Sequence, residues 1–329
     1  MSEDSAANRS SVQSSIIDSA GVKGSYAADS PLGLGVAFVP DYSPDILHLI
    51  DRARYRESIA ALTGKPFAIG YDEWRCYELS ALLPSGKPIQ ATASMRIPAS
   101  SESIVESKSL KLYLNSWNSR FVQSIDDFES SLRSDLSSRL GADVDISLAA
   151  ISELAMPGFS VPLAPVEEGA GQGVEQDVIE FRFRDALLLD SYDPMCSDYQ
   201  RNASLLSQGN RELKSGVFYS HLLRSNCPVT GQPDWASLII AFDGSESVSS
   251  IASLSPALDP EQVLRYVVSF RDHDGFHEQT VEQIYCDLLK LGFSRLAVCA
   301  QYTRRGGIDI TPIRTTGNVK LELPRFNRL

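Results

Sequence analysis

Several features of common protein classes are missing from this sequence. No run approaches the roughly 18 apolar residues of a membrane-spanning helix, and the first thirty residues lack the apolar core of a signal peptide. Basic residues are outnumbered, since 30 Lys and Arg against 42 Asp and Glu give a net charge of −12, which repels a phosphate backbone. We therefore expect a cytoplasmic protein that contacts neither membrane nor nucleic acid directly.

Cysteine and histidine are also scarce. The five cysteines show no CxxC spacing and form no zinc-type set with the four histidines, so we expect free thiols and no metal site. Cys286 and Cys299 lie within apolar segments and are predicted to be core thiols. The glycines at 33 and 35 lack the third glycine and preceding strand of a dinucleotide fingerprint, and those at 169–173 lie in an acidic stretch, so no Rossmann domain is predicted.

The composition is that of an ordinary globular protein, with 43% hydrophobic and 22% charged residues. A length of 329 residues is enough for two domains of about 150 residues each. Residues 1–30 are Ser-rich without hydrophobic periodicity and are predicted to be a disordered tail. The acidic, glycine-rich residues 165–178 are predicted to link an N-terminal module, 31–164, to a C-terminal module, 179–329.

Hydrophobic periodicity predicts a similar order of elements in the two modules. In the first, Ser124 and Gly141 are typical ends of a helix, and in the second, Asp259 followed by Pro260 is a typical helix start. Residues 112–117 align with 265–270 at one offset (266 − 113 = 153), which indicates an internal duplication. The predicted elements are strands over 74–83 and 89–97, helices over 110–117 and 125–140, a strand over 144–151, then strands over 216–224 and 236–242, helices over 260–270 and 277–291, and strands over 295–302 and 308–313.

The densest polar feature is the loop at 225–235, which lies between two predicted strands. Two prolines and a glycine make this loop double back, so that Cys227 and Asp234, seven residues apart, can meet. A carboxylate beside a thiol can accept its proton and return it, which nucleophilic cysteine catalysis requires. On spacing alone the simpler interpretation is favoured, in which Cys227 ends a strand and Asp234 caps a turn.

A second polar cluster joins the two helices predicted in the C-terminal module. His277 and Glu278 fall in the first turn of the later helix, where an imidazole at the rim of the buried face can relay protons. Glu278 can instead serve only to complement the helix dipole. His273 is interpreted as a solvated loop residue.

Two basic clusters complete the candidates. Residues 105–111 place hydroxyls, two lysines and free backbone N–H groups at a helix N-terminus, which is either a phosphate cradle or an ordinary capped helix with solvated lysines. Residues 302–307 form a basic loop whose glycines permit close backbone approach, and arginine forks suit phosphate oxygens. In so acidic a protein, such cationic clusters indicate an anionic ligand, with surface solvation as the alternative.

Four motifs, taken in order, resemble those of the NADPH-dependent 7-cyano-7-deazaguanine reductases, the nitrile reductases of queuosine biosynthesis. They are ESKSLKLY at 106–113, CPVTGQPDW at 227–235, FHEQ at 276–279 and YTRRGG at 302–307. The resemblance extends from residue 31 through the C-terminal half. It implies an α+β tunnelling fold (T-fold) of two tandem β-β-α-α-β-β modules with antiparallel sheets and paired helices, and an NADPH site without a Rossmann domain.

The resemblance also implies an activity and a role for each matching residue. The activity is the NADPH-dependent four-electron reduction of 7-cyano-7-deazaguanine to 7-aminomethyl-7-deazaguanine through a covalent cysteine thioimide, within queuosine biosynthesis for tRNA modification. The implied catalytic residues are Cys227, Asp234 and His277. The implied substrate-binding residues are Val105, Glu106, Ser107, His277 and Glu278, and the implied NADPH-binding residues are Ser107, Lys108, Arg305 and Gly306.

Each module carries part of this site, because Cys227 and Glu278 lie in the second module and Glu106 lies in the first. We therefore expect one complete site per chain, formed between the halves or across the subunits of a homodimer. Two other functions stay open. One is a cyclohydrolase-like purine or pterin enzyme of the same fold, which needs a Cys/His metal triad, and the other is a noncatalytic purine-binding module in which Cys227 is incidental. The tail, the acidic insert and the chain from Thr315 onward depart from the family pattern.

Overall fold

The computed structural model describes residues 42–59, 67, 69–151, 159–161, 178–245, 256–317 and 319–329. The predicted tail over 1–30 and the predicted linker over 165–178, apart from its last residue, lie outside these ranges, so both stay predictions. The glycines at 33–35 and 169–173 also lie outside the described ranges. No helix in the described ranges is long and apolar enough to cross a bilayer.

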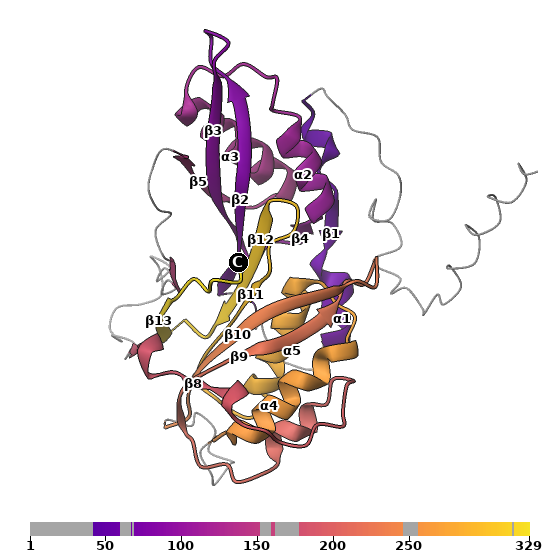
Figure 1. Ribbon diagram of the computed structural model, residues 1–329, viewed down its shortest axis with the longest axis vertical. Coiled ribbons are helices and arrows are strands. Elements are labelled where there is room, and N and C mark those ends of the chain that lie inside the picture. The colour runs from indigo at the N-terminus through magenta and orange to yellow at the C-terminus, as the bar shows by residue number, and fades with distance from the viewer. Residues whose placement is uncertain are drawn as a thin grey trace, which may run out of the picture.

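One sheet of eight strands passes through both halves of the chain, in the order β5-β3-β2-β12-β11-β10-β9-β8 (Figure 1). Neighbouring strands pair antiparallel except β8, which runs parallel to β9. The pairing of β12 with β2 joins the C-terminal half to the N-terminal half. The strands are β2 (Gly70–Leu82), β3 (Pro88–Pro98), β5 (Asp145–Ala150), β8 (Leu187–Leu188), β9 (Ser215–Asn226), β10 (Pro233–Asp243), β11 (Arg295–Tyr302) and β12 (Ile308–Thr315).

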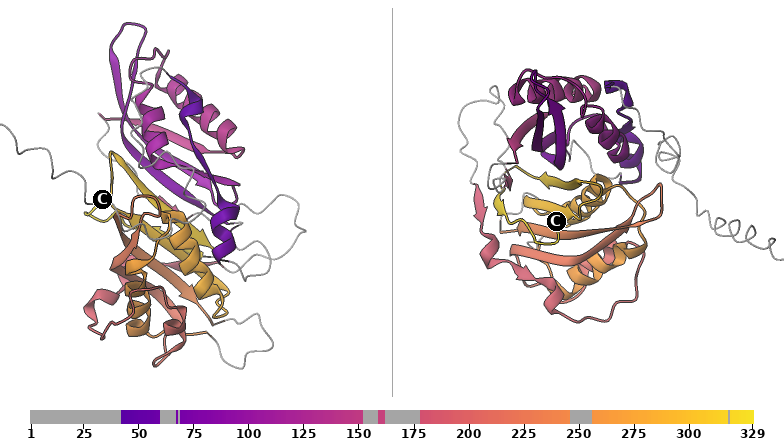
Figure 2. Two further views of the ribbon diagram at one scale, coloured as in Figure 1. Left: turned by 90° about the vertical axis from the view of Figure 1, so that its right-hand side faces the viewer. Right: turned by 45° about the horizontal axis from the view of Figure 1, so that its top comes forward.

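Four helices cover one face of this sheet, as the views of Figure 2 show. They are α2 (Ser107–Asn115) and α3 (Ile125–Leu140), which pack on β2 and β3, and α4 (Pro260–Val268) and α5 (His277–Leu289), which pack on β10 and β11. Local signals set their ends, because Ser124 caps α3, Gly141 ends it at φ 60°, and Asp259 caps α4. The predicted strands and helices are thus confirmed, with ends shifted by a few residues.

A small three-stranded sheet covers part of the opposite face. β13 (Val319–Leu323) pairs antiparallel with β6 (Phe159–Val161) and parallel with β7 (Ile179–Phe181). Successive residues of β10 serve the two faces, since Leu238 and Ile240 face the helices whereas Ile239 packs toward β13. None of these three strands was predicted. β6 and β7 have three residues each and are too short to show a period, whereas β13 alternates apolar and polar residues, a usable signal that was missed.

A strand-helix segment before β2 was also not predicted. β1 (Leu49–Asp51) pairs antiparallel with β4 (Ser103–Val105), and α1 (Arg52–Ile59) packs against α5. Short 3₁₀ helices occupy several connections: η2 (Pro44–Ile46), η3 (Phe183–Asp185), η4 (Leu189–Ser191), η5 (Ala203–Ser207) and η6 (Ser269–Asp272). The described chain is therefore an α+β fold, as expected.

The two halves share details beyond the order of their elements. α2 and α4 start 153 residues apart (260 − 107 = 153), and each follows an acidic capping residue. The Tyr113 hydroxyl donates to Asp135 at 2.5 Å, and the Tyr266 hydroxyl donates to Asp287 at 2.8 Å. Both long hairpins also shift register once along their length. An internal duplication would produce such recurring contacts.

Candidate active site

A cavity of about 290 Å³ lies where the two halves of the chain meet. β1, β4 and the start of α2 contribute to its wall from the N-terminal half. The loop between β9 and β10, the first turn of α5 and β12 contribute from the C-terminal half. The predicted site residues that line it are Val105, Glu106, Ser107, Lys108, Cys227, Asp234, His277, Glu278 and Arg305. Gly306 was predicted too, but it does not line the cavity.

The loop between β9 and β10 brings Cys227 and Asp234 to the same cavity. The Gly231 N–H donates to the Cys227 carbonyl at 2.9 Å, and the Cys227 N–H donates to the Gln232 carbonyl at 2.9 Å. Gly231 has φ +67°, a left-handed conformation that favours glycine. Cys227 is a free, half-buried thiol, and Asp234 is buried. The loop therefore doubles back as predicted.

The Asp234 carboxylate lies between two nitrogen groups. His277 Nε2 is 3.4 Å from its Oδ2, and Arg305 Nη1 is 2.9 Å from its Oδ1. Arg305 also donates to the Pro233 carbonyl. The sequence analysis related Arg305 to the cofactor alone, so its contact with Asp234 was missed. A carboxyl group held in this way is placed to exchange protons with a group in the cavity.

The interpretation of His273 as a solvated loop residue is wrong. Its imidazole packs edge-on against Phe270 with ring centroids 5.2 Å apart, and burial lowers its pKa to about 4. Its carbonyl accepts a 2.8 Å hydrogen bond from the Asn226 N–H, directly before Cys227. The neighbours Arg271, Asp272 and Asp274 are exposed, so the local sequence gave no sign that the His273 ring is covered.

Two buried carboxylates in the cavity wall have different partners. Glu278 Oε1 has no hydrogen-bond partner in the part of the chain that the structure describes. Burial raises the pKa of Glu278 to about 7, and the charge of Asp72 adds to this effect. The Glu106 carboxylate caps α2, accepting from the Lys108 N–H at 2.7 Å and the Ser109 N–H at 2.8 Å. Glu278 is therefore the more available acceptor for N–H donors of a ligand.

Cations gather where α2 borders the cavity. Lys108 and Lys111 line it from one face of this helix, and Arg305 lines it from the loop before β12. Burial lowers the pKa of Lys111, and the like charge of Arg305 adds to this effect. Lys111 was one of the two lysines of the predicted basic cluster at 105–111, but it was not among the implied NADPH-binding residues. Gly306 (φ +56°) lies beside it, since a Cβ there would come within 3.0 Å of Lys111 Cε.

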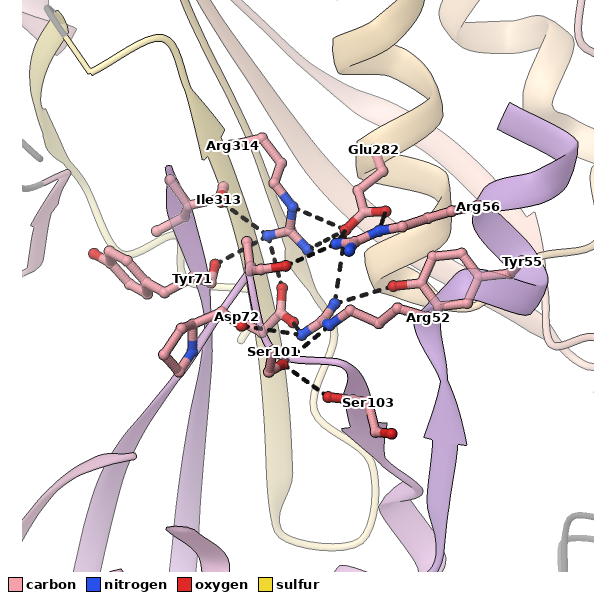
Figure 3. Close-up of polar contacts among 12 residues, drawn as sticks. Arg52, Tyr55, Arg56, Tyr71, Asp72, Ser101, Ser103, Glu282, Ile313 and Arg314 are labelled. Carbon is pink, nitrogen blue, oxygen red and sulfur yellow. Dashed lines mark hydrogen bonds and ion pairs between the residues drawn. The ribbon is translucent and has the colours of Figure 1, made fainter. Parts of the chain in front are cut away.

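A buried ionic network joins the two halves beside the cavity (Figure 3). Asp72 on β2 contacts Arg52 at 2.6 Å and Arg314 at 2.8 Å. Glu282 on α5 contacts Arg314 at 2.8 Å and Arg56 at 2.7 Å. Figure 3 shows these side chains pointing toward one another from α1, β2, α5 and β12. The network therefore holds α5 in place at Glu282, close to the first turn of the helix, which carries the cavity residues His277 and Glu278.

The buried thiols differ from Cys227. Cys286 and Cys299 are buried, as predicted, and burial raises the pKa of Cys286 to about 12. Within the ranges described, no three His, Cys, Asp or Glu side chains are grouped so that they could hold a metal ion. A cyclohydrolase-like site would require such a group near the cavity.

Two family models match the halves of the chain. One, described as "Nitrile reductase, 7-cyano-7-deazaguanine-reductase N-term", matches residues 38–148. The other, described as "QueF-like protein", matches residues 233–320. The first match contains the start of α2, and the second contains Asp234, the first turn of α5 and Arg305.

Whole relatives match most of the chain. The NADPH-dependent 7-cyano-7-deazaguanine reductase of Xanthomonas campestris pv. campestris (strain 8004) is 40% identical over 302 residues, which are 92% of this chain and 97% of the relative. That of Dechloromonas aromatica (strain RCB) is 37% identical over 290 residues, which are 88% of this chain and 91% of the relative. A crystal structure of the archaeosine synthase QueF-Like in the apo form matches 32% of this chain and 97% of its own chain, at 15% identity and a TM-score of 0.25. This chain belongs to the family of NADPH-dependent 7-cyano-7-deazaguanine reductases.

Proposed function

We propose that this chain uses NADPH to reduce the nitrile of 7-cyano-7-deazaguanine to the primary amine of 7-aminomethyl-7-deazaguanine, a step of queuosine biosynthesis. The observation that carries the proposal is that Cys227, Asp234 and Glu278 line one cavity. This reaction needs a nucleophile, a proton donor and a hydrogen-bond acceptor for a guanine-type base, and these three residues can supply them in that order. Membership of the reductase family supports the same activity.

Glu278 is the main acceptor for the base. Its buried Oε1, which has no hydrogen-bond partner among the described residues, gains one when it accepts from the N–H groups of the deazaguanine. Glu106 also lines the pocket. Its carboxylate oxygens cap α2 by accepting two backbone hydrogen bonds, and their remaining lone pairs can accept from the base. Val105, Ser107 and His277 complete the pocket around the base.

Cys227 attacks the nitrile carbon as a thiolate, after Asp234 has accepted the thiol proton. A C–S bond forms, one C–N π bond breaks, and its electron pair moves to the nitrogen, which takes the proton back from Asp234. The product is a covalent thioimide, whose carbon accepts hydride more readily than a nitrile carbon. After the first reduction the C–S bond breaks, its electron pair returns to sulfur, and an imine remains for the second reduction. His277, beside Asp234, returns protons to it.

The charge of the cavity fits an NADPH cofactor. Lys108, Lys111 and Arg305 would hold its phosphates, and the desolvated Lys111 beside Arg305 would gain an anionic partner. Ser107 adds a hydroxyl at the start of α2, and the small Gly306 lets the loop approach this region closely. When bound, NADPH supplies hydride, and two equivalents account for the four electrons of the reduction.

We propose in addition that residues 31–164 and 179–329 are two tandem T-fold modules, joined by the linker at 165–178 and preceded by a tail at 1–30. The recurring caps, Tyr–Asp bonds and register shifts of the two halves support this division. The proposed assembly is a homodimer, because β5 ends the eight-stranded sheet with an edge unpaired in the described chain. Light scattering of the purified protein tests it through the molar mass.

Turnover tests the proposed activity directly. The purified protein is mixed with the nitrile base and NADPH, and both the loss of NADPH absorbance and the amine product are followed. Two NADPH oxidised per amine formed is the expected result. Binding of the base without any NADPH oxidation would favour the noncatalytic purine-binding function instead.

A further inference from the structure

We propose that Tyr302 is a positioning residue for the reaction, because its ring lies flat against His277 and holds the imidazole beside Asp234. The inference rests on the proposed function, in which His277 returns protons to Asp234. Tyr302 does not line the cavity, so it acts through His277 and not on a ligand. The sequence analysis assigned it no role.

Strand pairing fixes where the Tyr302 ring lies. Tyr302 ends β11 and pairs with Ala236 of β10, two residues after Asp234. Its ring and the His277 imidazole are nearly parallel, with an angle of 8° and centroids 3.8 Å apart. The imidazole therefore has an aromatic ring against its face, while its Nε2 edge lies 3.4 Å from Asp234 Oδ2.

The Tyr302 ring is itself held firmly. It is 1% exposed and belongs to the same core cluster as Ala236 and Val281. Burial raises the pKa of its hydroxyl, and the hydroxyls of Ser225 and Thr280 adjoin it. A ring fixed by packing in this way can fix the side chain stacked on it.

The other contacts of His277 do not fix the imidazole by themselves. A nitrogen–oxygen distance of 3.4 Å is long for a hydrogen bond, and Nδ1 has no hydrogen-bond partner among the residues described. The face of the Tyr302 ring is therefore the contact that holds the plane of the imidazole.

The kinetic test compares Tyr302→Phe, which keeps the ring, with Tyr302→Leu, which removes it. Tyr285→Leu is the control for lost packing, because Tyr285 belongs to the same core cluster but lies eight residues after His277 on α5 (285 − 277 = 8). We expect kcat to fall about tenfold in Tyr302→Leu and to stay within about twofold in the other two, with the Kd of the nitrile base within about twofold in all three. The pH profile of kcat should change only in Tyr302→Leu. The charged groups around His277, which are Asp234, Glu278 and Arg305, are the same in all three variants, so such a change reports on His277 itself.

Proton NMR tests the stack without requiring turnover. In the wild type and in Tyr302→Phe the stacked ring should move the His277 ring protons upfield, with His277→Gln used for assignment, and Tyr302→Leu should abolish this shift. Ordinary His277 shifts in the wild type would overturn the proposal even if Tyr302→Leu does not fold. Equal losses of kcat in Tyr302→Phe and Tyr302→Leu, or an unchanged pH profile in folded Tyr302→Leu, would also overturn it. A wild type with upfield shifts and no nitrile reduction would refute the proposed function and, with it, this role.

Discussion

If Glu278 holds the base as proposed, base binding should depend on pH near neutrality. Because its pKa is raised to about 7, the carboxyl is protonated and neutral below that value and ionised above it. An ionised carboxylate accepts two N–H donors side by side, whereas the neutral acid has one oxygen that donates. We expect the Kd of the nitrile base, measured by titration calorimetry, to rise about tenfold for each pH unit below 7 and to level off above it.

Glu278→Gln gives the matched comparison for this pH dependence. It should bind the base weakly at every pH while NADPH binding is unchanged, because the amide cannot ionise and the cations lie on α2 and before β12. A wild-type Kd that stays constant across the same pH range would show that Glu278 does not hold the base.

At the residue scale, local patterns predicted part of the site. The turn that brings Cys227 and Asp234 to one cavity was predictable, because Pro228, Gly231 and Pro233 between them are turn signals, whereas their catalytic pairing was implied by the motif resemblance alone. The 2.9 Å contact of Arg305 with Asp234 was not predictable, because it depends on how the loop before β12 packs on β10. The raised pKa of Glu278 likewise depends on burial that comes from the whole fold.

At the scale of elements, the helices α2 and α4 begin alike but differ in their position relative to the cavity. Glu106 caps α2 and lines the cavity, whereas Asp259 caps α4 away from it. We expect Asp259→Ala to lower the free energy of unfolding by about 1 kcal/mol with kcat/KM unchanged. Glu106→Ala should lose a similar amount of stability and also weaken base binding about tenfold.

Denaturant unfolding and base titration of both variants check this difference. Loss of base affinity in Asp259→Ala equal to that in Glu106→Ala would mean that the two caps affect the site only through stability. Retained affinity in a folded Glu106→Ala would remove Glu106 from the base pocket.

Periodicity and capping residues predicted the long elements and missed the short ones. The alternation from Ile89 to Ile97 and the caps Ser124 and Asp259 each correspond to an element of the structure. α1 was missed because its buried face includes a charged residue, Arg52, so the helix shows no apolar stripe in the sequence. The charge of Arg52 is balanced by Asp72.

At the scale of the whole molecule, we expect the buried ionic network to couple stability to the proposed base binding. Asp72→Asn removes the anion between Arg52 and Arg314 and should lower the free energy of unfolding by about 3–5 kcal/mol. It also removes a negative charge that raises the pKa of Glu278, so the pH below which base binding weakens should shift below 7.

Asp143→Asn, at an exposed position between α3 and β5, makes the same charge change as a control. It should leave the free energy of unfolding and the pH dependence of base binding near their wild-type values. If Asp72→Asn folds and keeps the wild-type pH dependence of base binding, the network does not influence Glu278.

Long-range pairing is the part of the fold that the sequence does not reveal. Asp72 and Arg314 are 242 residues apart (314 − 72 = 242), and no local pattern relates β12 to β2. The motif resemblance predicted that each half carries part of one site. The network that holds the halves together at that site was not foreseen, because its members share no local pattern in the sequence.

Covalent capture of the nitrile by Cys227 is the step on which the proposed mechanism depends. Wild-type protein mixed with the nitrile base and no NADPH should gain the mass of one intact base per chain, measured by intact-protein mass spectrometry, because addition to a nitrile expels nothing. Cys196→Ala, which removes another partly exposed free thiol, should keep the adduct, and Cys227→Ala should lose both adduct and turnover. An adduct that persists in Cys227→Ala, or turnover near the wild-type rate in that variant, would contradict the account.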